Sequence, residues 1–148
     1  LIADEPTSAL DMSVQAQILN LMRDLQDRLG LTLLFISHNL AAVSYMADEI
    51  AVMYLGRIVE HGPAGAVLAQ PLHPYTKLLF EAVPDIGAIG HRRTPLKGDP
   101  PSPIAPPSGC AFHPRCPFVT PRCRVERPLP RDFAGVRVAC HEAERMLG

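Results

Sequence analysis

Residues 1–11 read Leu1-Ile2-Ala3-Asp4-Glu5-Pro6-Thr7-Ser8-Ala9-Leu10-Asp11, a short apolar run followed by two carboxylates and a polar loop. An apolar run of this kind is typical of a buried β-strand, which places the carboxylates at its C-terminal end. In open α/β sheets, ligands bind at that edge. The stretch therefore predicts an α/β fold with an acidic binding edge, although an isolated Asp-Glu pair is also compatible with a solvated loop.

Helix and strand patterns alternate downstream of this stretch. A helix capped by Asp11 or Ser13 and ended by Gly30 is predicted from apolar residues that recur every three or four positions. These residues are Val14, Ile18, Leu21, Met22, Leu25 and Leu29. The further predicted elements are strands at 31–36, 49–54 and 57–61 and helices at 40–46, 64–68 and 74–82. The mostly apolar 31–36 strand is expected to be covered on both faces, and the element order predicts a parallel sheet with an antiparallel edge hairpin.

Charge and proline content divide the 148 residues into dissimilar parts. Residues 1–90 carry a net charge of −6, residues 91–148 carry +5, and eleven of the 16 prolines lie between Pro95 and Pro130. We therefore expect three segments: an α/β part at 1–62, a helical extension at 63–94, and a mostly irregular, proline- and cysteine-rich tail at 95–148. The longest aliphatic run is far too short to span a membrane. Because the first residues are apolar and lack a start methionine, the chain is interpreted as a C-terminal piece.

The 1–11 stretch resembles the Walker B segment and D-loop of ATP-binding-cassette (ABC) transporter ATPases. By that resemblance, Asp4 is the acid associated with Mg²⁺ and ATP, and Glu5 is the catalytic base. The D-loop that reaches toward a second ATPase subunit is then Ser8, Ala9, Leu10 and Asp11. In the run Ile36-Ser37-His38-Asn39, His38 matches the family's switch histidine, which contacts the γ-phosphate of ATP. A histidine at a strand end is otherwise more often structural.

The segment Pro71-Leu72-His73-Pro74-Tyr75-Thr76-Lys77-Leu78-Leu79 is similar to a signature of oligopeptide, dipeptide and nickel importer ATPases. By themselves, His73-Pro74-Tyr75 are compatible with a capped turn that opens a helix. The resemblance implies an ATPase subunit, bound peripherally at the cytoplasmic face of the membrane, that couples ATP hydrolysis to peptide uptake. Its implied partners are a second ATPase subunit in a homo- or heterodimer, transmembrane permease subunits and an extracytoplasmic peptide-binding protein. The transported substrate is not encoded here.

Neither a Walker A loop nor the family's signature motif occurs in the sequence. The chain by itself is therefore expected to be inactive and prone to aggregate through strands that lack neighbours.

The four cysteines, Cys110, Cys116, Cys123 and Cys140, all lie in the tail, separated by five, six and sixteen residues. In a cytosolic protein such a group favours a metal site over disulfides, and four thiolates satisfy a [4Fe–4S] cluster. Zn²⁺ is the alternative, although the spacing lacks the usual two-residue knuckles. His113 and His141 are weaker substitute ligands. The region around Cys110 also resembles the cysteine-rich tail of peptide-importer ATPases, some of which carry such a cluster.

The arginines of the tail raise the question of nucleic-acid binding, but few aromatic residues accompany them, so no nucleic acid is expected. A different class of function remains open: a non-catalytic, metal-binding regulatory module with an α/β scaffold.

Overall fold

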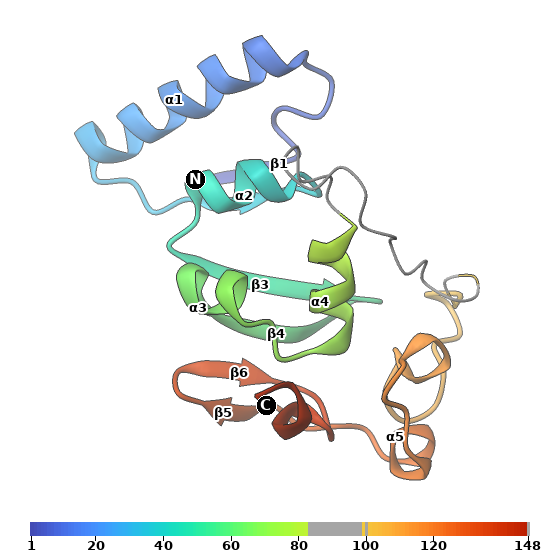
Figure 1. The fold of residues 1–148 in the computed structure, drawn as a ribbon. Coiled ribbons are helices and arrows are strands. Elements are labelled where there is room, and N and C mark those ends of the chain that lie inside the picture. Colours follow the sequence, from blue (N-terminus) through green and yellow to red (C-terminus); the bar gives the residue numbers. More distant parts are fainter. Residues whose placement is uncertain (83–98, 100, 148) are drawn as a thin grey trace, which may run out of the picture. The chain divides into compact units, whose positions relative to one another are not determined.

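The structure, a computed structural model, describes residues 1–82, 99 and 101–147 (Figure 1). The start of the proline-rich stretch and the end of the expected helical extension lie outside these residues. The chain divides into two compact units, Leu1–Asp48 and Glu49–Gly148. Among the described helices, none combines the length and apolarity needed to cross a membrane.

The first unit contains a two-stranded parallel sheet and two helices. Its elements are β1 (Ile2–Asp4), α1 (Met12–Leu29), β2 (Leu34–Ile36) and α2 (Leu40–Met46). β1 and β2 run in parallel with Ile2 opposite Leu34 and Asp4 opposite Ile36, which confirms the predicted parallel pairing. Both strands therefore end at the same edge of the sheet.

Local capping determines where α1 begins and ends. The Asp11 carboxylate accepts hydrogen bonds from the backbone N–H groups of Ser13 and Val14, at 3.0 and 2.9 Å. Gly30 closes the helix in the left-handed conformation, with φ of 61°, and its N–H donates to Gln26 O. The predicted N-cap at Asp11 and the predicted end at Gly30 are both confirmed.

The predicted apolar stripe on α1 was partly wrong. Leu19, which was not assigned to the stripe, is the buried residue of the helix, whereas Leu21 and Leu29 are 53% and 64% exposed. Leu19 packs with Ala42 and Met46 of α2, and Met22, Leu33 and Phe35 pack against this cluster. Helical periodicity alone does not say which of two overlapping faces meets the neighbouring helix.

The expectation of a strand at 31–36 covered on both faces was also wrong in the described residues. Only Leu34–Ile36 forms strand, and Leu34 and Ile36 are largely exposed while Phe35 between them is partly buried. The alternation arises because successive side chains of a strand point to opposite faces, and only the face of Phe35 packs on the core of this unit.

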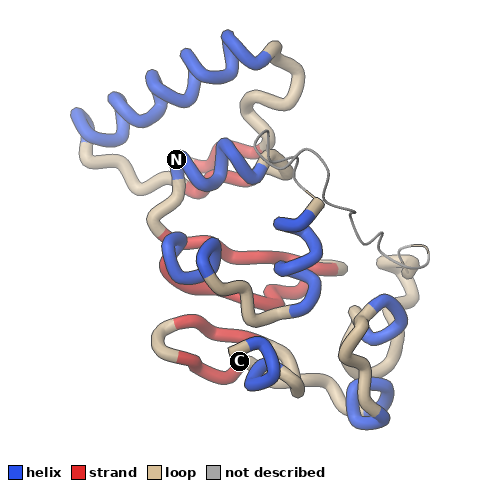
Figure 2. Tube along the Cα trace, viewed as in Figure 1, coloured by secondary structure: helices blue, strands red, loops and turns tan. Residues whose placement is uncertain are grey.

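The second unit is built on a four-stranded antiparallel sheet in the order β3-β4-β6-β5 (Figure 2). Its strands are β3 (Glu49–Tyr54), β4 (Arg57–Pro63), β5 (Arg131–Phe133) and β6 (Val136–Val138). Its helices are α3 (Ala64–Ala69), α4 (Pro74–Glu81), α5 (Pro121–Val125) and the 3₁₀ turns η1 (His113–Arg115) and η2 (Ala143–Met146).

The predicted β3–β4 hairpin is confirmed, with Leu55 and Gly56 at positive φ in its turn. The sequence analysis did not predict that the tail would extend this hairpin. Glu60 of β4 lies opposite Val138 of β6, so the tail contributes two strands to the same sheet.

Phe112 forms the centre of an aromatic cluster in the second unit and is 1% exposed. Its ring lies 5.3 Å from Tyr54, 5.5 Å from Tyr75 and 5.9 Å from His73, measured between ring centroids. Phe112 comes from the tail, Tyr54 from the hairpin, and His73 and Tyr75 from the start of α4. One core therefore joins segments that the sequence analysis treated separately.

Candidate functional site

Glu5 and His38 meet at the C-terminal edge of the parallel sheet. Each residue closely follows one of two adjacent strands, and Glu5 N–H donates to Ile36 O at 2.8 Å, which continues the β1–β2 ladder by one step. The Nδ1 atom of His38 then lies 2.9 Å from Oε1 of Glu5. Because a carboxylate only accepts hydrogen bonds, Nδ1 carries a proton in this pair and the Nε2 atom remains open.

Glu5 has a left-handed backbone conformation, with φ of 45°. This region is sterically unfavourable for residues with a side chain and often accompanies functional positions. Here it turns the chain out of β1 directly after the ladder bond to Ile36. The Ser8 hydroxyl and N–H both donate to Glu5 O, at 3.1 and 3.2 Å, and hold the turned backbone in place.

The 7–11 loop is fixed at both ends and exposed between them. Thr7 is buried, and its hydroxyl accepts a hydrogen bond from Gln15 Nε2 at 3.1 Å. At the other end, hydrogen bonds from Val14 N–H and from Ser13 hold the pKa of Asp11 below its usual value. The Asp11 carboxylate is thus engaged in capping α1. Ser8, Ala9 and Leu10 remain exposed.

Asp4 is exposed at the last position of β1. Among the described residues its carboxylate has no hydrogen-bond or ion-pair partner. Proteins often bind Mg²⁺ through one or two carboxylates together with substrate phosphates, so a free carboxylate at a strand end fits this ion.

The Glu5 and His38 side chains are 46% and 75% exposed. An ion pair this accessible to water contributes roughly 0–1 kcal/mol to stability, so the pair does not determine the local fold. The strand ends place the two groups, which leaves them available to a ligand. Chemically, the pair offers a carboxylate in contact with an imidazole, a set suited to proton transfer, and Asp4 precedes Glu5 at the end of β1.

All four cysteines are free thiols in the second unit, and Cys123 and Cys140 are buried. Cys110 N–H donates to Cys123 O at 2.9 Å, which holds the Cys110 loop against α5. Burial raises the pKa of the Cys116 thiol to about 11 and that of Cys140 to about 12, and the neighbouring cysteine thiols raise both further. The four side chains therefore lie close enough to influence one another.

Backbone N–H groups are also directed at three of these sulfurs. For each of Cys110, Cys116 and Cys140, the sulfur interacts with the backbone N–H of the residue two positions later in the chain. Each of these interactions lowers the thiol pKa and so partly offsets the increase that burial causes. For Cys140 the Glu142 N–H lies 3.4 Å from the sulfur. N–H groups in this arrangement stabilise negative charge on sulfur, as found around iron–sulfur centres. The N–H groups near these three sulfurs thus partly offset the effect of burial on their thiolate forms.

Within the described residues, no group of three or more His, Cys, Asp or Glu side chains is arranged to hold a metal ion. Of the two suggested substitute ligands, His113 Nδ1 lies 3.0 Å from Cys110 O and His141 Nε2 lies 2.9 Å from Glu126 O. Both rings are thus oriented by backbone carbonyls.

His73 occupies the N-cap of α4, as expected for a turn that opens a helix. Its Nδ1 accepts a hydrogen bond from Tyr75 N–H at 3.1 Å, and Pro74 follows at the first helical position. Glu60, fully buried in β4, accepts hydrogen bonds from Leu72 N–H at 2.7 Å and His73 N–H at 3.0 Å. This segment therefore contributes to the packing of the second unit.

Sequence reasoning missed one feature of the second unit, a pocket lined by Arg57 and Arg127. Arg127 was considered only as part of a basic tail, and Arg57 not at all. Seventy positions separate the two residues, so no local pattern pointed to their proximity.

Comparison with known proteins places these features in a family context. Residues 59–123 match the family model "Oligopeptide/dipeptide transporter, C-terminal region". The whole chain is 52% identical to part of the di/tripeptide transport ATP-binding protein DppF of Pseudomonas aeruginosa and covers 46% of that protein.

Two further relatives are also ATP-binding proteins of peptide transport. A probable peptide ABC transporter ATP-binding protein of Sinorhizobium fredii is 57% identical over 95% of this chain, which covers 40% of that protein. A dipeptide transport ATP-binding protein of Haemophilus influenzae is 51% identical, again over 95% of this chain and 43% of its own length. The chain thus spans less than half the length of these relatives. The resemblance to peptide-importer ATPase subunits, in their C-terminal half, is confirmed.

Proposed function

We propose, starting from this match to the C-terminal part of peptide-importer ATP-binding proteins, that the chain is part of an ATP-hydrolysing subunit of an ABC importer for oligopeptides or dipeptides. The observation that carries the proposal is the Glu5–His38 pair at 2.9 Å, together with the free carboxylate of Asp4 at the last position of β1. A sequence match alone would not require the Glu5 and His38 side chains to meet at one sheet edge.

In the proposed mechanism, the Glu5 carboxylate accepts a proton from the water that attacks the γ-phosphate. His38 Nδ1 donates to Glu5 and orients its carboxylate. The Nε2 atom of His38, which has no partner in the described residues, is available to contact a phosphate oxygen. Asp4 would hold Mg²⁺, which neutralises developing phosphate charge when bound. The exposed residues 8–10 are available to contact a second ATPase subunit.

The implied assembly is also part of the proposal. The subunit would pair with a second ATPase subunit, identical or related, and dock on transmembrane permease subunits at the cytoplasmic face of the membrane. An extracytoplasmic peptide-binding protein would deliver the substrate.

The test is Glu5→Gln in the complete subunit that contains this chain. The amide retains the shape of the side chain but cannot accept the proton, so ATP hydrolysis should fall about 10²- to 10⁴-fold while ATP binding is retained. His38→Ala should also slow hydrolysis with binding largely retained. Asp27→Asn, which removes an exposed carboxylate from α1, is the matched control and should leave the rate unchanged. Near-normal hydrolysis in the Glu5 variant would remove Glu5 from the catalytic role.

We further propose that Cys110, Cys116, Cys123 and Cys140 hold a [4Fe–4S] cluster, with Zn²⁺ as the alternative. The four free thiols that influence one another and the N–H groups directed at three sulfurs support this assignment. When bound, the group would cross-link the Cys110 loop, α5 and the segment after β6.

Anaerobic purification tests the cysteine proposal. The protein should then contain about four iron atoms per chain, absorb broadly near ~400 nm as thiolate-bound clusters do, and lose that absorbance in each Cys→Ser variant. Colourless protein with one equivalent of zinc would favour the alternative. Four thiols that react freely with a thiol reagent in the native, metal-replete protein would exclude both.

A second candidate, a non-catalytic metal-binding module, rests on the same cysteines. The two functions differ in the complete subunit, because only the importer ATPase loses ATP hydrolysis on Glu5→Gln. A subunit that binds metal but has no Glu5-dependent hydrolysis would favour the module.

A further inference from the structure

A pocket of about 80 Å³ lies in the second unit, and its lining residues all belong to that unit. It is lined by the start of β4, the loop that carries Cys110 and Phe112, and the segment 127–130. A cavity needs about 10–15 Å³ to hold one water molecule, so this pocket has room for several waters or a small organic group. Pockets that bind drug-sized ligands have volumes of about 300–1,000 Å³, so this pocket is too small for a whole nucleotide.

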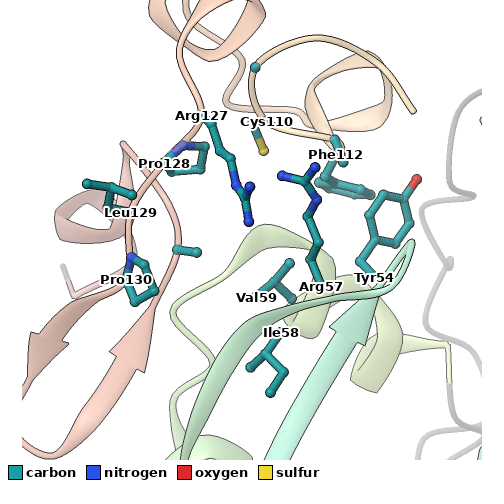
Figure 3. Close-up of a pocket in the computed structure, with 13 residues that line it drawn as sticks. Tyr54, Arg57, Ile58, Val59, Cys110, Phe112, Arg127, Pro128, Leu129 and Pro130 are labelled. Carbon is teal, nitrogen blue, oxygen red and sulfur yellow. The ribbon is translucent and has the colours of Figure 1, made fainter. Parts of the chain in front are cut away.

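Two arginine side chains extend into this pocket. Figure 3 shows the guanidinium groups of Arg57 and Arg127 directed toward the same space from opposite sides, with the sulfur of Cys110 nearby. Two like charges that converge in this way repel each other unless an anion lies between them.

Three other arginines of the unit are each paired with a carboxylate. Arg122 is paired with Glu126, Arg131 with Glu144, and Arg145 with Glu142. In the part of the chain that the structure describes, neither Arg57 nor Arg127 has a hydrogen-bond or ion-pair partner, and no carboxylate lines their pocket. The positive charge is therefore available to a ligand.

The remaining wall of the pocket is mostly apolar. It includes Phe112, Pro128, Pro130 and two side chains that are unusually exposed for their type, Ile58 at 52% and Leu129 at 75%. An inorganic anion would use only the two guanidinium groups and leave these apolar surfaces in contact with water. A molecule that carries both a negative group and an apolar part would use the whole pocket.

We propose that Arg57 and Arg127 form a binding site for a small organic carboxylate. The planar guanidinium fork matches a carboxylate through two parallel hydrogen bonds, and the apolar wall receives the hydrocarbon part of the ligand. The site goes beyond the proposed ATPase function and does not require hydrolysis, so it can be tested separately from the ATPase.

Calorimetric titration of the complete subunit that contains this chain with benzoate tests the proposal, with neutral benzamide and inorganic phosphate as comparison probes. Benzoate should bind more tightly than either. Arg57→Gln and Arg127→Gln should each weaken benzoate binding about tenfold, because each removes one charge-assisted pair of hydrogen bonds. The matched control is Arg137→Gln, an exposed arginine of β6 outside the pocket, which should leave benzoate affinity unchanged.

Chemical protection gives a second readout that needs no variant. Phenylglyoxal modifies accessible arginines, and mass spectrometry should show that benzoate slows the modification of Arg57 and Arg127 but not of Arg137. Equal binding of benzamide would overturn charge recognition. Tighter binding of phosphate would overturn the organic carboxylate in favour of an inorganic anion. Benzoate affinity that is unchanged in both pocket variants, or modification that benzoate does not slow, would overturn the site.

Discussion

The position of the Glu5 and His38 side chains follows from the backbone that precedes each of them. Both groups are largely accessible to water, so their mutual attraction is too weak to hold them together by itself. Parallel pairing of β1 with β2 brings the strand ends side by side, and the left-handed turn at Glu5 directs its side chain toward His38. The pairing of these residues is thus a consequence of strand register.

His73 is the residue whose titration should most affect the stability of the second unit. It is 1% exposed, and burial lowers its pKa from 6.5 to about 4. Between these values the unfolded chain binds a proton that the folded chain does not. The free energy of unfolding should therefore decrease as the pH falls from about 6.5 to about 4, by roughly 3 kcal/mol from this group. Urea unfolding at a series of pH values measures the slope.

Glu60 acts in the opposite direction, because burial raises its pKa and the folded state retains a proton that the unfolded state loses. The measured slope is therefore smaller than the contribution of His73 alone. His73→Asn separates the two, since the asparagine oxygen still accepts a hydrogen bond at the N-cap but does not titrate. The free energy of unfolding of this variant should no longer decrease toward low pH. An acid dependence equal to that of the unsubstituted chain would assign the effect to another group.

At the scale of elements, α1 depends on Asp11 for its first turn. Asp11→Ala removes the acceptor for two N–H groups, so amide hydrogen exchange at Ser13 and Val14 should become several-fold faster. Asp11→Asn retains an oxygen at this position and should largely preserve protection. Folding lowers the pKa of the Asp11 carboxyl, so in the unsubstituted chain its contribution to the free energy of unfolding should be lost as the pH falls below 3.8. The Asn variant does not titrate and should show no such loss. Unchanged protection in the Ala variant would contradict the capping role.

The Cys110 loop depends on Gly109. This residue has φ of +66°, and a Cβ atom placed on it would lie 2.4 Å from Cys123 O. Gly109→Ala should therefore combine backbone strain with a clash against α5. Gly56→Ala is the matched control, since Gly56 has φ of +73° with nothing within 4 Å of a Cβ atom.

The Gly56 variant should lose about 1–2 kcal/mol of stability from strain alone. The Gly109 variant should lose about 1–3 kcal/mol more, because the neighbouring backbone has to move. Chemical unfolding of both variants measures the difference. Equal losses would mean that the Cys110 loop can move away from α5 at little cost.

At the largest scale, the second unit should unfold as one body around Phe112. Phe112→Ala should destabilise it by about 3–5 kcal/mol, because the ring contacts aromatic groups from the hairpin and from α4. Hydrogen exchange should accelerate both in β3–β4 and in the Cys110 loop. Phe118→Ala, at a partly buried position, is the control and should have a smaller effect. Faster exchange confined to the tail would show that the hairpin does not depend on this core.

Local interactions explain which features were predictable from the sequence. The cap at Asp11, the end of α1 at Gly30, the turn at Leu55-Gly56 and the His73 cap each involve residues within a few positions of one another. The strand ends at Glu5 and His38 are also local, and a single parallel pairing is enough to bring them together. For the caps and the turn, neighbouring residues carry the whole physical cause, whereas the Glu5–His38 contact also needs the pairing of β1 with β2.

Features that depend on distant segments were decided only by the tertiary structure. The buried face of α1 depends on where α2 packs, so Leu19 lies in the core while Leu21 and Leu29 do not. Pairing of β6 with β4 and the insertion of Phe112 bring the tail into the sheet and core of the hairpin.

The convergence of Arg57 and Arg127 has the same origin, because it follows from that packing and from no pattern in either segment. The sequence by itself thus determined the helix caps, the hairpin, the acidic strand edge and the family resemblance, since their causes lie within short stretches of chain. The tertiary structure alone decided the joint core and the arginine pocket, because contacts between residues far apart in sequence form only when the whole unit folds.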